Sequence, residues 1–233
     1  GTFKTRKGPI FANFVLADEI NRAPSKVQSA LLEAMQERQV TIGDRSYPLE
    51  GLFLVMATQN PIEQEGTYPL PEAQLDRFFF KLLVGYSNRR EVATIIDRTT
   101  REEMVEPAQV MDGEEILKWQ GLVREVFLAP HLQDYIVRLV SATRTHPDVY
   151  LGASPRGSLA VYRASQAFAA LSGRDYVIPD DVKALAESAL AHRIILKTAA
   201  SIRGVESRSI VSEMLMSVPI AAPRPSAEVR GVP

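Results

Sequence analysis

The feature that most constrains this chain is a short apolar run, Phe14 to Ala17, which ends in the adjacent carboxylates Asp18 and Glu19. Such a run predicts a strand that is buried on both faces of a parallel sheet. Ligands gather beyond the carboxyl ends of such strands, where the two acids fall. A hydrated Mg²⁺ held by Asp18, with Glu19 polarising a water, would compensate the paired charges. The alternative is an exposed acidic pair that opens the next helix.

A second apolar run, Leu52 to Met56, predicts another buried strand, and Asn60 follows closely after it. Its side chain would lie at the same strand-end edge as Asp18. A neutral amide there can orient a water or a phosphate oxygen without altering the charge balance. An asparagine before Pro61 is otherwise a common turn residue.

The residues between these two strands predict a helix and a hairpin. Pro24 suits a first helical turn, and a helically spaced apolar stripe follows it, so that one face should pack on the sheet. The stripe comprises Val27, Ala30, Leu31, Ala34 and Met35. Farther along, Gly43-Asp44 suits a tight turn between residues 40–42 and 47–49, which predicts a β-hairpin.

The residues after the second strand predict a change from a sheet to helices. Pro71 opens a short helix that runs through Arg77, and Phe78 to Leu83 predicts a third strand, so Arg77 would be held at a helix–strand junction. From Gly85 to Asn88 onward the pattern is purely helical. Two pairs at capping-box spacing predict helix starts. The pairs are Asn88 with Glu91 and Asp112 with Glu115.

Four segments of the chain, in order, resemble the motifs of one family. They are Asn21 to Arg38, Ala57 to Pro61, Leu70 to Phe78 and Gly152 to Arg156. They are similar to the segment after the Walker B motif, sensor 1, the arginine-finger helix and sensor 2 of AAA+ ATPases of the MoxR family. The four motifs together cover most of residues 8 to 200, so the resemblance is specific.

The resemblance implies an α/β fold, in which a truncated P-loop AAA+ core, a parallel sheet with flanking helices, is followed by an all-α lid domain. The expected boundaries are 1–86 for the C-terminal part of the core, 87–111 for a linker and the first lid helix, 112–200 for the helical lid, and 201–233 for a C-terminal helix and a mobile tail.

The resemblance also implies ATP and Mg²⁺ as cofactors and a role for each site residue. Asp18 would hold Mg²⁺, directly or through water, and Glu19 would activate the attacking water that Asn60 positions. Arg77 would reach the γ-phosphate bound to a neighbouring subunit, and Arg156 would contact the nucleotide from the lid. Local pairing of Arg77 with a nearby carboxylate remains the alternative for that residue.

A P-loop needs the pattern G-x-x-x-x-G-K-[ST], and these 233 residues contain no Gly-Lys dipeptide. In the family resembled, the P-loop lies upstream of the position where Gly1 aligns. We therefore expect an N-terminally truncated fragment that is inactive by itself and does not bind ATP measurably. A natural paralogue that has lost the loop is the alternative.

The function that the resemblance implies is ATP hydrolysis by a homo-oligomeric ring, expected to be a hexamer, that remodels or activates partner proteins. Proteins with a von Willebrand factor A domain are the expected partners. Two alternatives stay open. One is an ATPase subunit of the magnesium-chelatase type, and the other is a non-hydrolysing scaffold subunit.

Composition excludes several other classes. A net charge of −1 gives no basic excess for general nucleic-acid binding, and no apolar run is long enough to span a membrane. The absence of cysteine excludes disulfides and thiolate metal sites and fits a cytoplasmic protein. The three histidines share no ligand spacing, so we expect no metal site from them.

Overall fold

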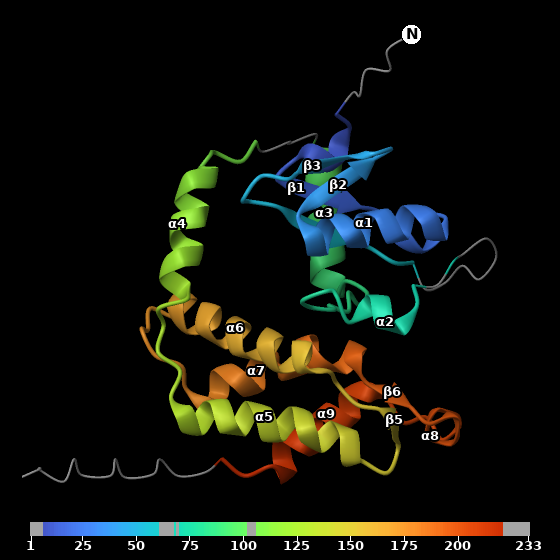
Figure 1. Cartoon of the computed structure of the whole chain (residues 1–233), viewed down its shortest axis with the longest axis vertical. Helices are drawn as coiled ribbons and strands as arrows, with labels where there is room; N and C mark the ends of the chain where they lie inside the picture. Colours follow the sequence, from blue (N-terminus) through green and yellow to red (C-terminus); the bar gives the residue numbers. More distant parts are fainter. Residues whose placement is uncertain (1–6, 61–67, 69, 102–105, 221–233) are drawn as a thin grey trace, which may run out of the picture.

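The computed structural model describes residues 7–60, 68, 70–101 and 106–220. An α/β part, formed by the N-terminal residues, lies at one end of the molecule in Figure 1, and a helical lid lies at the other. The short helix α2 (Glu72–Leu75) lies between them. The mobile tail expected after the last helix falls on residues 221–233, outside the described residues.

The α/β part is built on strand β1 (Phe14–Ala17), which pairs in parallel with β4 (Leu54–Ala57). The register places Ala17 opposite Ala57, so the chain leaves both strands at the same edge. The prediction that these strands are buried on both faces is wrong for the described residues. Phe14 and Leu16 are 51% and 63% exposed, because alternate side chains point to opposite faces and only one face is packed.

Helix α1 (Ser25–Glu37) supplies the packing for the covered face. Its buried side differs from the predicted stripe, because Val27 is exposed whereas Gln28 is buried. The Gln28 amide donates hydrogen bonds to the carbonyl of Ile20, at 3.1 Å, and to that of Tyr68, at 2.8 Å. These bonds satisfy a buried polar side chain and set which face of the helix turns inward.

The hairpin prediction is confirmed, whereas the third strand is not. Strands β2 (Gln39–Ile42) and β3 (Arg45–Pro48) pair antiparallel, and Gly43 between them has a φ of 61°. Residues 78–83 form no strand, because no described strand lies beside them to complete a ladder. This segment instead runs along the lid, where the Lys81 amide donates to the Ser188 carbonyl at 3.0 Å.

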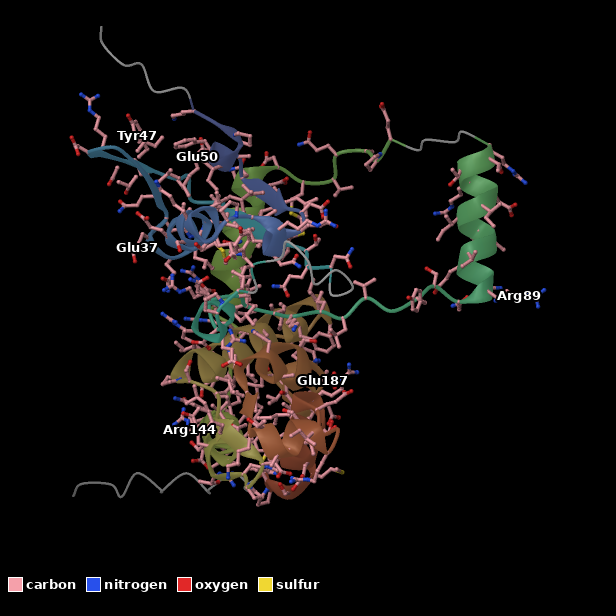
Figure 2. The ribbon with its side chains drawn as sticks, turned by 90° about the vertical axis from the view of Figure 1, so that its right-hand side faces the viewer. Glu37, Tyr47, Glu50, Arg89, Arg144 and Glu187 are labelled. Carbon is pink, nitrogen blue, oxygen red and sulfur yellow. The ribbon has the colours of Figure 1, made fainter. Side chains whose placement is uncertain are left out.

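Two helices lead into the lid, and both begin at the predicted capping boxes. They are α3 (Arg89–Thr100), capped by Asn88, and α4 (Gly113–Val123), capped by Asp112. Every residue of α3 is exposed, and Figure 2 shows this helix, which begins at Arg89, standing clear of the rest of the molecule.

The lid has a large apolar core, which includes Tyr135, Leu139 and Val161, all fully buried. Its main helices are α5 (Pro130–Thr145), α6 (Pro155–Leu171), α7 (Pro179–Leu190) and α9 (Ser207–Ser217). The smaller elements are β5 (Val149–Leu151), η3 (Ala191–Arg193), β6 (Ile195–Leu196) and α8 (Thr198–Ile202). In the part of the chain that the structure describes, no helix is long and apolar enough to cross a membrane.

Candidate nucleotide and metal site

The hydroxyl of Thr58 bonds to both residues of the predicted acidic pair, to the carboxylate of Asp18 and to the backbone of Glu19. It donates a 2.6 Å hydrogen bond to Oδ1 of Asp18 and accepts a 2.8 Å bond from the backbone N–H of Glu19. The backbone of Thr58 also bonds to Ala17 and Ile20, at 3.1 and 3.0 Å. The end of β4 therefore fixes the end of β1 through both its main chain and a side chain.

Glu19 has a backbone conformation that is rare outside glycine, with a φ of 47° in the left-handed region. A non-glycine residue is held there only where its surroundings over-determine it, as the bonds of Thr58 do. The Glu19 carboxylate forms a 2.9 Å ion pair with Arg22, and both side chains are partly exposed. The carboxylate that we expect to activate water is thus paired with a cation in this conformation.

Asn60 lies at the same edge of the sheet. Its backbone carbonyl accepts a 3.2 Å hydrogen bond from the side-chain amide of Asn21, which follows Glu19 by two residues. Asp18 is exposed, whereas Glu19 and Asn60 are half-buried. The structure therefore gathers the three residues that were predicted for metal binding and water activation.

The two predicted arginines belong to a second group of residues, at the contact between the segment after α2 and the lid, which we call the seam. Arg156 is in the first turn of α6, 52% exposed, and its Nη1 lies 3.4 Å from Oδ2 of Asp76. Arg77 is exposed in the turn after α2, and its side chain forms no ion pair within the described ranges. The helix–strand junction predicted for Arg77 is wrong, because residues 78–83, which follow it, form no strand.

Asp76 is the centre of this seam, with only 17% of its side chain exposed. It accepts hydrogen bonds from Ser154 Oγ, at 3.0 and 3.1 Å, and from Nε of Arg193, at 3.1 Å. Burial lowers the pKa of the Arg193 guanidinium, and the charge of Asp76 acts against that shift. An ion pair with so little exposure holds only if it is well hydrogen-bonded, as this one is.

Sequence reasoning missed several residues of these groups, among them Thr58, Asp76, Arg22 and Arg193. Thr58 and Asp76 each adjoin or lie close to a predicted site residue, so the neighbours of a motif carried some signal. Arg22 also belongs to the segment after the Walker B motif that the resemblance identified. Arg193 gave no local signal, because it meets Asp76 from 117 residues away.

The carboxylates fit one side of a magnesium–nucleotide site. Magnesium usually takes one or two protein carboxylates and completes its shell with phosphate and water. Asp18 suits this role because it is exposed at the strand end and its Oδ1 is already oriented by Thr58. Among the described residues, no cluster of three or more acidic, histidine or cysteine ligands offers a separate all-protein metal site.

Comparisons with known proteins agree with this fold. The family described as "ATPase family associated with various cellular activities (AAA)" matches residues 1–80, and the AAA lid domain matches residues 141–214. A crystal structure of a suspected ATPase from Cytophaga hutchinsonii superposes with a TM-score of 0.91 at 43% identity, covering 95% of this chain and 70% of that one.

Several curated proteins are also similar. YeaC of Bacillus subtilis, itself uncharacterised, is 47% identical over 95% of this chain and 70% of its own length. The chaperone MoxR1 of Mycobacterium tuberculosis is 46% identical over 93% of this chain, which spans 59% of that protein. The protein MoxR of Methylorubrum extorquens is 32% identical over 89% of this chain and 65% of its own length. The fold, the two family matches and these relatives show that the chain belongs to the MoxR family of AAA+ ATPases.

Proposed function

We propose that these residues serve a Mg²⁺-dependent ATPase that hydrolyses ATP and works as a ring on partner proteins. The observation that carries the proposal is the Thr58 hydroxyl, which orients the Asp18 carboxylate and holds the backbone of Glu19. Phosphoryl transfer depends mainly on positioning and electrostatics, so a fixed pair of carboxylates at a strand end suits it.

Each carboxylate has a separate task in this proposal. Asp18 holds the magnesium ion, which supplies charge neutralisation for the phosphates when bound. Glu19 accepts a proton from the attacking water, which requires its carboxylate to turn away from Arg22. The Asn60 amide orients that water without adding charge.

The arginines complete the site from outside the sheet. The exposed Arg77 has no ion pair within the described ranges, and its neighbour Asp76 is occupied by lid residues, which weakens the alternative of local pairing. We therefore assign Arg77 to the γ-phosphate bound by an adjacent subunit of a homo-oligomeric ring, which we propose is a hexamer. Arg156 is assigned to the nucleotide of its own subunit. The same proposal includes partner proteins that carry a von Willebrand factor A domain. It also places this protein in the cytoplasm.

The first test separates the two carboxylates and requires a P-loop, which these 233 residues lack. It is made in the protein expressed from the complete reading frame. Glu19→Gln should keep nucleotide affinity and slow hydrolysis by about 10²-fold or more, the scale for losing a general base. Asp18→Asn should instead weaken Mg²⁺-dependent nucleotide binding, with Glu72→Gln, a change of an exposed carboxylate on α2, as the control. Unchanged turnover in Glu19→Gln would refute the assignment.

A second test addresses the ring. Arg77→Ala and Glu19→Gln subunits, each nearly inactive, are mixed at varied ratios after sizing has confirmed that they co-assemble. Activity that peaks at intermediate ratios supports an arginine acting between subunits, since a neighbour then completes each defective site. An Arg77→Ala protein with wild-type turnover would show that the residue belongs only to the surface.

The scaffold alternative rests on the missing P-loop and has its own discriminator. If the reading frame upstream of Gly1 encodes no Gly-rich loop with Lys-Ser or Lys-Thr, hydrolysis by this subunit is excluded. In calorimetry, the 233-residue chain alone should bind Mg·ATP without measurable affinity, because it lacks the backbone cradle and lysine for the phosphates. Micromolar binding would show that other residues hold the nucleotide.

A further inference from the structure

One carboxylate, Asp76, joins the segment that carries Arg77 to two separate elements of the lid. Ser154, the N-cap of α6, and Arg193, at the end of η3, both donate hydrogen bonds to it. These elements lie 78 and 117 residues from Asp76 along the chain, and both reach its side chain. In Figure 1, the helices of the lid lie below α2, the helix that Asp76 follows. The residue next to Asp76 is the exposed arginine assigned to the neighbouring subunit.

Arg193 is the fixed part of this connection. Only 3% of its side chain is exposed, and it donates to the carbonyls of Phe78, at 2.7 Å, of Phe79, at 3.3 Å, and of Asp76, at 3.3 Å. It also donates to the carbonyl of Ala189 in α7. Moving this guanidinium would leave a buried charge and several carbonyls without partners, which is costly.

Arg156 makes the weakest of the contacts with Asp76. Its contact with Asp76 is the longest of the three, at 3.4 Å, and about half of its side chain is exposed. An exposed ion pair of this kind contributes little, so a stronger anion can take the guanidinium away. Asp76 would still keep Ser154 and Arg193 as partners after that exchange.

We propose that Asp76 is a positioning residue that ties Arg77 to the lid through Arg193 and Ser154, and that it holds Arg156 until a nucleotide phosphate takes this arginine over. The inference rests on the proposed ATPase function. It assigns to one side chain the coupling between nucleotide contact in the lid and the arginine offered to the next subunit.

The structural half of the proposal is tested on the 233-residue chain by hydrogen-exchange mass spectrometry without nucleotide. Asp76→Asn keeps the shape of the side chain and removes its charge. The amides of residues 76–81, which include the Lys81 bond to Ser188, should exchange about tenfold faster or more. Peptides from β1, β4 and α5 should not change, and Glu72→Gln should leave all peptides as in the wild type. Unchanged exchange at 76–81 would overturn the proposal.

The positioning half needs a measurement that simple loss of structure would not produce. In the protein from the complete reading frame, Asp76→Asn should lower turnover about 10- to 100-fold, the scale for misplacing a catalytic group. Affinity for a fluorescent ATP analogue should stay equal or tighten up to about fivefold, because Arg156 no longer has to leave Asp76. A structural defect would weaken both quantities, and that outcome would refute the proposal.

Two further variants keep the test decisive. Arg156→Ala in the Asp76→Asn background should abolish any gain in affinity, since the freed arginine is its source. If Asp76→Asn does not fold, Arg193→Lys serves instead, because it keeps a cation beside Asp76 but loses the fork that binds the carbonyls; it should lower turnover without weakening nucleotide binding. If Glu19→Gln abolishes turnover while the seam variants behave as wild type, the ATPase assignment stands and only this inference fails.

Discussion

The lid and the α/β part differ in how completely their apolar side chains are buried. In the lid, Tyr135, Leu139 and Val161 have no exposed surface, and helices α5, α6, α7 and α9 close around them. In the α/β part, the side chains on one face of the β1–β4 pair are about half exposed or more. These are Phe14, Leu16, Leu54 and Met56.

This difference indicates that the two regions are specified by different interactions. Apolar burial stabilises the lid, where each core side chain contributes about 1.5–3 kcal/mol. The predicted catalytic groups instead depend on a few directed hydrogen bonds, from Thr58 at the strand ends and to Asp76 at the seam. Truncating a core side chain of the lid should therefore affect stability, whereas truncating Thr58 or Asp76 should mainly affect the geometry of the predicted site.

The largest expected effect is in the lid core. Leu139→Ala should destabilise the lid by about 2–5 kcal/mol, because the side chain is fully buried and its removal leaves a cavity. The matched change Leu16→Ala, at a side chain 63% exposed, should cost much less, since little of it is removed from water by folding. Region-resolved hydrogen exchange during urea titration measures both. Equal costs would show that the outer face of the sheet is covered in solution, and would break the comparison.

The sequence could predict features that depend on neighbouring residues, but not those that depend on contacts between distant segments. The two capping boxes and the Gly43 hairpin were predictable because each depends on residues within a few positions of one another. The strand at residues 78–83 was not, because an apolar run becomes a strand only where a neighbour can pair with it. The seam was also out of reach, since Arg193 and Asp76 are brought together only by the packing of the lid.

The candidate site shows the same limit at closer range. The order of Asp18 and Glu19 after an apolar run pointed to the edge of the sheet, and the structure places Asn60 there too. The pattern could not show that Glu19 pairs with Arg22, because that contact depends on the left-handed turn at Glu19.

An intermediate effect is expected at the boundary between the two regions, where His192 lies. Its Nε2 is 3.1 Å from the Phe78 carbonyl, and burial, together with the charges of Arg193 and Lys81, lowers its pKa to about 4, although Asp76 and the Phe78 bond act in the opposite direction. The unfolded chain, with a histidine pKa near 6.5, then binds more protons than the folded one between these values. Stability should be complete above about pH 6.5 and fall as the pH approaches about 4, by roughly 2–3 kcal/mol.

His192→Gln provides the measurement for this effect. The variant lacks the titrating ring, so the difference in unfolding free energy between wild type and variant should shrink or reverse as the pH falls over this range. His131→Gln, on α5, should keep the pH dependence of the wild type and controls for the loss of a histidine as such. A constant difference between wild type and His192→Gln would show that the ring is not buried at the seam in solution.

The smallest effect on global stability is expected at α3, the helix whose residues are all exposed. Asn88 accepts hydrogen bonds from the amides of Arg90 and Glu91, both at 3.0 Å, so Asn88→Ala should cost this helix about 0.5–2 kcal/mol. A lone helix of 12 residues is marginal in water, and this loss should unfold it locally. The melting temperature of the lid should stay unchanged, because among the described residues α3 contributes no side chain to the lid core.

The matched variant is Asp112→Ala at α4, a helix with Ile116 and Val123 half-buried. Hydrogen exchange should accelerate throughout α3 in Asn88→Ala, whereas in Asp112→Ala it should accelerate only in the first turn of α4, where packing supports the rest. Asn88→Asp should restore protection, since aspartate caps as well as asparagine. If Asn88→Ala lowered the melting temperature of the lid, α3 would have to be packed against another part of the protein in solution. The exposed helix α3 would then be part of the packed lid, and the lid would extend beyond the helices that form its core here.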